Sequence, residues 1–184
     1  KVPPTQPLPD SITDLVGAAN VFTNDEDRIR HSGGQSYLDL PGRRPAGADA
    51  APDAVGLPAD AGQTGPLLDI CAEAGIAVVP FGGGTSVVGG IAPIRGDHDR
   101  VISLDLVNLR GCDIDPVSRT ARLGAGLRGP EAEKLLGAEG FTLGHFPQSF
   151  EYATIGGFAA TRSAGQSSSG YGRFDSMVSS VRLI

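Results

Sequence analysis

PFGGGTSVVGG, at residues 80–90, is the most informative stretch of this 184-residue chain. It continues an apolar run, residues 76–79, of the kind that forms a buried β-strand. Three consecutive glycines leave the backbone N–H groups uncovered by side chains. Glycine also tolerates the positive φ of a tight turn, which we expect near Gly83. Several such N–H groups can point at one negatively charged group. The stretch therefore predicts a loop that holds a phosphate or a diphosphate.

Two familiar phosphate loops do not fit these residues. A Walker loop needs a Lys after its glycines, and none follows Gly84 here. A G-x-G-x-x-G fingerprint opens a helix, whereas the residues after Ser86 are Val, Val, Gly and Gly, which start a helix poorly. A glycine turn without function is the alternative interpretation. The hydroxyls of Thr85 and Ser86 favour the functional one, because both can donate a hydrogen bond to a phosphate.

The neighbouring residues place this loop in an α/β lobe. We expect a strand at residues 54–57, a helix at residues 66–73 that ends at Gly75, and a strand at residues 76–81. Together they form a β-α-β unit whose second strand leads into the glycines. Parallel α/β sheets bind ligands at the carboxyl ends of their strands, which agrees with a phosphate site at this position.

The rest of the chain extends this picture on both sides. Towards the N-terminus we expect two short helices and a loop, at residues 10–20, 24–31 and 41–52. Towards the C-terminus a strand at residues 100–106 leads into an α+β lobe. The elements expected in that lobe are a hairpin of residues 112–114 and 120–123, a helix at residues 130–136 that ends near Gly137 and Gly140, and a strand at residues 178–184.

Residues 144–172, GHFPQSFEYATIGGFAATRSAGQSSSGYG, form a second stretch rich in small and polar residues. Such a composition suits a wall against which a flat or extended ligand lies. An ordinary Gly/Ser surface loop explains residues 166–170 equally well, but the segment ATIGGFAATR indicates a closely packed helix. Arg162 is the candidate counter-charge for a diphosphate, and a solvated surface arginine is the alternative.

Composition and charge limit the partners of this chain. A net charge of −6 and a pI near 4.9 argue against a nucleic-acid partner, which needs a basic face. An anionic cofactor remains compatible, because backbone N–H groups and one or two arginines can hold a diphosphate. No stretch approaches the roughly 20 apolar residues of a membrane span, and no signal-peptide pattern is present. We therefore expect a cytoplasmic protein without an integral membrane segment.

The cysteines and histidines suggest little chemistry of their own. Two cysteines make no disulfide framework, and Cys71 lies in an apolar helical pattern, where a buried small hydrophobe is expected. A covalent link to a cofactor through either thiol is the minor alternative. His31, His98 and His145 are isolated and show no metal-ligand spacing, so no metal is expected. We interpret His145 as structural, with a contact to the cofactor as the alternative.

Three motifs resemble, in order and spacing, the FAD-binding domain of the vanillyl-alcohol-oxidase (PCMH-type) flavoproteins. They are PFGGGTS, then TLGHFPQSFEYATIGGFAATRSAG, then YG. The branch they resemble is that of alkylglycerone-phosphate synthase and the bacterial FAD-linked oxidases. RIRHSGGQSYLDL, at residues 28–40, also resembles the entry region of that branch. The resemblance implies an α+β, two-lobed PCMH-type FAD-binding fold at residues 52–184, with a small α/β lobe and a larger α+β lobe. Residues 1–51 are expected to be a helical and loop extension.

The resemblance also implies which residues contact FAD. The diphosphate loop of the family falls on Pro80, Phe81, Gly82, Gly83, Gly84, Thr85 and Ser86. A second segment falls on Pro147, Gln148, Ser149, Phe150, Glu151, Tyr152 and Ala153, and a third on Ala160, Thr161, Arg162 and Ser163. The family often has Asp in place of Gln148 and Leu in place of Phe150. At these two positions the resemblance therefore carries backbone contacts rather than side-chain contacts.

The cap domain and the catalytic residues of the family come later than Ile184, so the resemblance assigns no catalytic residue here. We expect the chain to be the N-terminal part of a longer protein, with an FAD-binding domain truncated at its C-terminal end. Some relatives tether FAD to a His in or near the glycine loop. Residues 80–90 contain no His, so non-covalent FAD is expected.

The resemblance implies a flavoenzyme, with two branches for its reaction. In the synthase branch an acyl group on glycerone phosphate is exchanged for a fatty alcohol without net redox. In the oxidase and dehydrogenase branches the flavin accepts hydride from a 2-hydroxy acid or a similar alcohol. The expected partners are FAD, a small-molecule substrate held mainly by the missing cap, and a second copy of the chain. The alternatives of another class are a non-catalytic FAD or nucleotide module and a phosphate-binding α/β domain without flavin.

Overall fold

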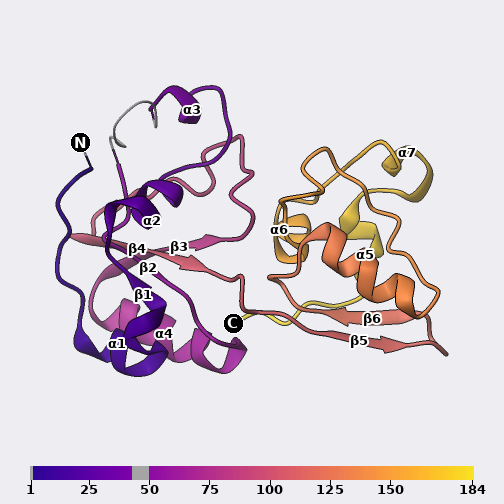
Figure 1. The fold of residues 1–184 in the computed structure, drawn as a ribbon, viewed down its shortest axis with the longest axis horizontal. Helices are drawn as coiled ribbons and strands as arrows, with labels where there is room; N and C mark the ends of the chain where they lie inside the picture. The colour runs from indigo at the N-terminus through magenta and orange to yellow at the C-terminus, as the bar shows by residue number, and fades with distance from the viewer. Residues whose placement is uncertain (1, 43–49) are drawn as a thin grey trace. The chain divides into compact units, whose positions relative to one another are not determined.

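The computed structural model describes residues 2–42 and 50–184, which form two compact units (Figure 1). Unit 1 spans Lys1–Asn108 and unit 2 spans Leu109–Ile184. Unit 1 is an α/β unit and unit 2 an α+β unit, as the sequence predicts. Among the described helices, none has the length and apolar character needed to cross a lipid bilayer.

Unit 1 is built on a four-stranded sheet in the order β1-β2-β4-β3. β2 (Ala54–Gly56), β3 (Ile76–Phe81) and β4 (Arg100–Asp105) are parallel, and β1 (Val21–Phe22) runs antiparallel to β2. The parallel strands are rich in apolar residues throughout, which suits a sheet covered on both faces. The expected β-α-β unit is confirmed, with β4 inserted between its two strands. Because parallel strands end at one edge, the last residue of β3 lies beside the last residue of β4.

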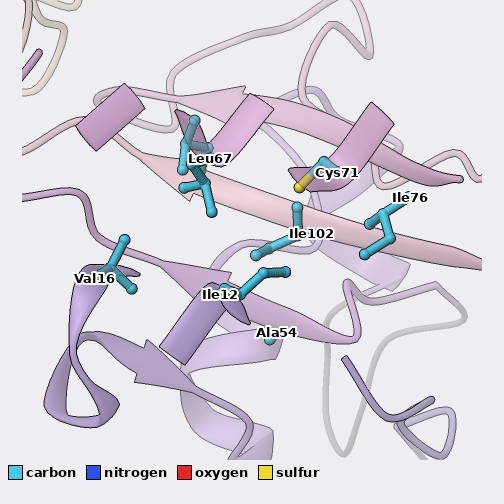
Figure 2. Close-up of a cluster of buried hydrophobic side chains, with 8 residues drawn as sticks. Ile12, Val16, Ala54, Leu67, Cys71, Ile76 and Ile102 are labelled. Carbon is cyan, nitrogen blue, oxygen red and sulfur yellow. The ribbon is translucent and has the colours of Figure 1, made fainter. Parts of the chain in front are cut away.

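Helices α1 (Asp10–Val16) and α4 (Ala61–Glu73) pack on one face of this sheet (Figures 1 and 2). Leu67 and Cys71 are four residues apart, so they share one side of α4 and both reach the core. Ile102, in the central strand β4, is fully buried beneath them. The buried residues of this core are Ile12, Val16, Ala54, Leu67, Cys71, Ile76, Ile102 and Leu104.

Helix α2 (Asp25–Arg30) lies on the other face and carries a buried arginine. The Arg28 Nε donates to the carbonyl of Pro52 at 2.7 Å, and one terminal nitrogen donates to the carbonyl of Pro3 at 2.6 Å. The other terminal nitrogen lies 3.1 Å from the Asp25 carboxylate. A buried guanidinium is tolerated only when its donors are satisfied. Arg28 therefore ties the extended N-terminal segment to α2 and to the entrance of β2.

Asp53, which follows Pro52 directly, is a buried acidic residue with no exposed surface. Its Oδ1 accepts hydrogen bonds from the Gln6 N–H at 2.8 Å and from the Arg95 guanidinium at 3.0 Å. Its Oδ2 accepts a hydrogen bond from the Val101 N–H at 2.8 Å. One carboxylate thus joins the N-terminal segment, the start of β4 and the connection that precedes it.

Unit 2 combines a hairpin with short helices. The strands β5 (Cys112–Asp115) and β6 (Thr120–Leu123) pair antiparallel across the expected turn. The helices are α5 (Gly129–Ala138), α6 (Ile155–Ala160), α7 (Ser168–Tyr171) and the 3₁₀ helix η2 (Phe174–Met177). The core consists of Leu127, Ala132, Ala153, Ile155, Phe158 and Phe174.

The two N-terminal helices of the prediction correspond to α1 with the 3₁₀ helix η1 (Ala18–Asn20), and to α2. Asn24 caps α2 as expected, because its side chain accepts a hydrogen bond from the Asp27 N–H at 3.0 Å. Of the predicted loop at residues 41–52, residues 43–49 lie outside the described part of the chain. The loop prediction is wrong at residues 41 and 42, which belong to the short helix α3 (Asp39–Gly42).

One predicted helix start and one predicted strand are wrong. Helix α4 begins at Ala61 rather than at residue 66, because the Asp60 carboxylate accepts the N–H groups of Gly62 and Gln63 and caps it earlier. Helix α5 ends at Ala138, between Gly137 and Gly140, as expected. Residues 178–184 form no strand. Their apolar composition alone does not make one, since a strand needs a neighbouring strand to satisfy its backbone groups.

Candidate anion-binding site

The candidate site begins where β3 ends. The glycine loop, defined here as residues 82–86, follows Phe81 directly. In the parallel register, Phe81 is paired with Asp105, the last residue of β4. The loop therefore leaves the sheet at the carboxyl edge of its parallel strands, which is where α/β sheets bind their ligands. This placement agrees with the one predicted from the sequence.

The backbone N–H groups of the loop are unused. Within residues 2–42 and 50–184, no acceptor bonds to the N–H groups of Gly82, Gly83, Gly84, Thr85 or Ser86. The Ser86 Oγ accepts from the Gly90 N–H at 3.1 Å, which leaves its own hydrogen free to donate. Backbone donors without partners on a strand-to-loop turn are the arrangement that a phosphate group satisfies. The loop thus fits an anionic ligand.

The left-handed residue of the loop is Gly84, with φ 68°, and not Gly83 as expected. The difference has a packing reason. A Cβ on Gly84 would lie 2.8 Å from the Cζ of Phe81, so the turn folds closely over this ring. Gly84 is therefore required twice, for its backbone conformation and for its close approach to Phe81.

The ring of Phe81 also contacts His31, with ring centroids 4.2 Å apart. His31 is buried, and its Nδ1 lies 2.7 Å from the carbonyl oxygen of Asp27, while its Nε2 lies 3.0 Å from the Asp105 carboxylate. Both of these oxygens can accept a hydrogen bond, and the tautomer of the ring decides which of its nitrogens donates. His31 thereby connects α2 to the end of β4, at the edge of the sheet where the glycine loop begins.

Sequence reasoning missed this supporting layer. It treated His31 as isolated and assigned no contact with the loop to Asp105 or to Gly34, which lies against the end of the loop. The only signal was the resemblance of residues 28–40 to the entry region of a flavoprotein branch. That segment supplies contacts to the loop from a distance of about fifty residues along the chain, which local patterns do not reveal.

In unit 2, the predicted segment at residues 147–153 is a run of turns. The N–H of Phe150 donates to the Pro147 carbonyl at 3.0 Å, and the N–H of Ala153 donates to the Ser149 carbonyl at 2.8 Å. The Phe150 ring lies against Gly129, where a side chain would overlap with it. Outward from this anchored backbone stand the exposed side chains of Gln148, Glu151 and Tyr152.

Three predicted contact residues at the end of α6 have partners inside unit 2. The Thr161 hydroxyl donates to the Gly157 carbonyl at 2.8 Å, and the Ser163 hydroxyl lies 3.0 Å from the Nε2 of His145. The Arg162 Nε donates to the Asp175 carboxylate at 2.8 Å, and this bond holds the pKa of Asp175 below its ordinary value. The roles of these residues in cofactor binding stay predictions.

His145 belongs to the core of unit 2. It is 1 % exposed and packs edge-on against Phe158 and tilted against Phe174, with ring centroids 5.0 and 5.1 Å apart. Burial lowers the pKa of His145, because the charged ring would lose its hydration. The structure thus supports the interpretation that His145 is structural.

The two thiols are poor nucleophiles. Burial raises the pKa of Cys71 to about 11, and burial together with the neighbouring Asp113 carboxylate raises the pKa of Cys112. Only a thiolate reacts readily. Neither cysteine is therefore a ready attachment point for a cofactor.

Comparison with known proteins identifies the ligand class. The family described as FAD binding domain matches residues 52–184. The chain belongs to this family. Its fold is the two-lobed PCMH-type FAD-binding fold, shared with p-cresol methylhydroxylase at a TM-score of 0.65 and 19% identity, over 82% of this chain and 28% of that one. FAD is the cofactor that the family binds.

The relatives are larger flavoproteins. An alkyldihydroxyacetonephosphate synthase of Trypanosoma brucei brucei is 34% identical over 97% of this chain and 30% of its own length. An uncharacterized FAD-linked oxidoreductase of Escherichia coli, YgcU, is 29% identical over 95% of this chain and 36% of its own. A solved alkyldihydroxyacetonephosphate synthase superposes with a TM-score of 0.93 at 31% identity, over 100% of this chain and 36% of that one. The chain spans about a third of the length of these relatives.

Proposed function

We propose that the glycine loop, residues 82–86, holds the diphosphate of FAD on its backbone N–H groups. The observation that carries this proposal is the set of unused donors at the carboxyl edge of a parallel sheet. The Thr85 and Ser86 hydroxyls supply further donors.

The other predicted cofactor contacts lie in unit 2, and their part in binding rests on the resemblance to the family. The exposed side chains at residues 147–153 and the end of α6 at residues 160–163 would line the rest of the cofactor, with Arg162 as counter-charge. When bound, the flavin supplies the reactive centre of the enzyme. The cofactor is proposed to be non-covalent, because residues 80–90 contain no His and both thiols have raised pKa values.

For the whole protein we favour an alkylglycerone-phosphate synthase-like reaction. Dihydroxyacetone phosphate and glycerone phosphate are one compound, and the synthases align with nearly all of this chain. The alternative is an oxidase or dehydrogenase of a 2-hydroxy acid or similar alcohol, supported by the oxidoreductase relative. The small-molecule substrate, a homodimer and a cytoplasmic location stay predictions, as does the extent of the FAD-binding domain at residues 52–184 with an extension before it.

FAD titration of the intact apoprotein tests the binding proposal. We expect saturable binding with a flavin spectrum, and loss of binding in Gly83→Val. Gly83 does not occupy the left-handed region, so valine there obstructs the anion with less backbone strain than at Gly84. The matched control is Gly137→Ala, at a position where no atom lies within 4 Å of the added Cβ. Wild-type FAD affinity in Gly83→Val contradicts the proposal.

Two assays on the full-length protein separate the reactions. Exchange of a labelled fatty alcohol into acyl-glycerone phosphate supports the synthase. Anaerobic bleaching of the flavin by a 2-hydroxy acid supports the dehydrogenase. FAD binding without either activity on a panel of such substrates favours the non-catalytic module.

A further inference from the structure

The far end of the glycine loop is held by two residues of the N-terminal segment. The Gln35 N–H donates a hydrogen bond to the Ser86 carbonyl, with an N–O distance of 2.7 Å. Gly34 lies so close to this carbonyl that a Cβ on it would overlap the oxygen. Only glycine lets the two backbones approach this closely. A larger residue at position 34 must displace Ser86 and the loop with it.

The near end of the loop is held through an aromatic ring. Phe81 supports the left-handed turn at Gly84, and His31 lies against Phe81. His31 in turn is held by two hydrogen bonds, one with the Asp27 carbonyl in the first turn of α2 and one with Asp105 at the end of β4. The ring therefore has little freedom to move, and it transmits the position of α2 to the loop.

We propose that His31 and Gly34, with the Gln35 N–H, are positioning residues that preset the glycine loop for the cofactor. They hold both ends of the loop so that its N–H groups converge before the ligand arrives. This inference rests on the proposed binding of FAD by that loop. Ordering a flexible loop when the ligand binds costs part of the binding free energy, and a loop that is already ordered avoids this cost. Loosening either contact therefore weakens binding, although neither side chain needs to touch the cofactor.

The first test measures the FAD dissociation constant of Gly34→Ala in the full-length protein. We expect at least a tenfold increase. Leu67→Ala is the stability control, because Leu67 lies in the core cluster beneath α1 and α4, which includes no residue of the loop. We expect Leu67→Ala to lower the thermal midpoint while its FAD affinity, measured below that midpoint, stays within twofold of wild type. Wild-type affinity in Gly34→Ala, or an equal loss in Leu67→Ala, overturns the inference.

The second test stands even if Gly34→Ala does not fold. His31→Leu removes both ring nitrogens, whereas His31→Gln keeps an amide that can donate to Asp105. We expect His31→Leu to raise the dissociation constant at least tenfold and His31→Gln to recover most of that loss. ADP, which carries the diphosphate without the flavin, should lose affinity by the same factor as FAD. Equal affinities of the two variants, or an effect on FAD that ADP does not share, overturn the inference.

The wild-type titration separates the two proposals. If the wild-type protein binds neither FAD nor ADP, the proposed function fails. If it binds both and the variants at positions 31 and 34 bind equally well, the function stands and only the positioning role fails.

Discussion

Arg162 is predicted to contact the cofactor, and in the structure its side chain forms an ion pair. Its guanidinium binds Asp175, yet the Arg162 side chain is 61% exposed and that of Asp175 is 33% exposed. Exposed ion pairs contribute roughly 0–1 kcal/mol. A diphosphate carries more negative charge than the Asp175 carboxylate and can accept several hydrogen bonds from the guanidinium. It can therefore compete with Asp175 for this arginine. The pairing therefore leaves the predicted role of Arg162 open to a direct test.

We expect Arg162→Ala to weaken FAD binding by about 1–3 kcal/mol, because a charge-assisted hydrogen bond is lost. Asp175→Asn should not weaken binding, because it frees the guanidinium for the ligand. Arg173, whose Nε lies 3.5 Å from the same carboxylate, provides the control variant Arg173→Ala. Calorimetric titration measures all three. Unchanged affinity in Arg162→Ala assigns this residue to the surface of unit 2.

Residues were predictable from the sequence where their role is local. The glycine loop is recognisable from five consecutive residues, and the Asn24 cap of α2 bonds to a residue only three positions further on. His31 was missed because its partner Asp105 lies 74 positions further on. Gly34 was missed for the same reason, since its need for glycine comes from the Ser86 carbonyl rather than from its own turn.

Among the elements, α4 depends on its N-terminal cap. The Asp60 carboxylate accepts hydrogen bonds from two N–H groups of the first turn, at 2.7 and 3.1 Å. We expect Asp60→Ala to lower the free energy of unfolding by about 1 kcal/mol, because these donors lose their partner. Asp60→Asn should retain most of the stability, since Asn caps equally well. Denaturant unfolding followed by circular dichroism measures both, and equal losses in the two variants contradict the capping role.

Helices and strands were predictable where an apolar run and the residues that end it indicated the same element. Residues 76–81 form a strand because an apolar run ends at glycines on both sides. The start of α4 was placed too late because Gly62, Gly65 and Pro66 suggest a loop, although the cap at Asp60 and the buried Leu67 and Cys71 outweigh them. The prediction of a strand at residues 178–184 was wrong, because an apolar composition does not specify a neighbouring strand with which to pair.

At the scale of a whole unit, the buried His145 predicts an acid-sensitive unit 2. Burial lowers its pKa in the folded state, so below its ordinary value of 6.5 the unfolded chain takes up a proton that the folded chain resists. The contribution of His145 to stability is complete above pH 6.5 and is lost as the pH falls below it. We expect the thermal midpoint to drop between pH 7 and pH 5.

The control for this prediction is His145→Gln, which cannot titrate but keeps a polar group near Ser163. Its midpoint should vary less over the same range. The carboxyls of Glu131 and Asp175 stay ionised there, because their pKa values lie below 4.5 and 3.8. Equal pH profiles of wild type and His145→Gln would falsify the assignment.

The sequence also predicted the architecture of unit 1 only in part. The β-α-β unit follows from alternating patterns, but the insertion of β4 between β2 and β3 does not, because strand order is set by long-range pairing. The same holds for the two buried charges. Arg28 and Asp53 look like ordinary surface residues in the sequence, and only the fold shows that they anchor the N-terminal segment.

Those anchors bear on how this protein can be divided in the laboratory. A polypeptide that started at Pro52, where the family match begins, would keep the glycine loop and every strand except β1. It would lose α1 from one face of the sheet and α2 from the other, and the Asp53 carboxylate would lose one of its donors. Expression of such a fragment should give insoluble material, and recombinant work on flavin binding is better started ahead of α1.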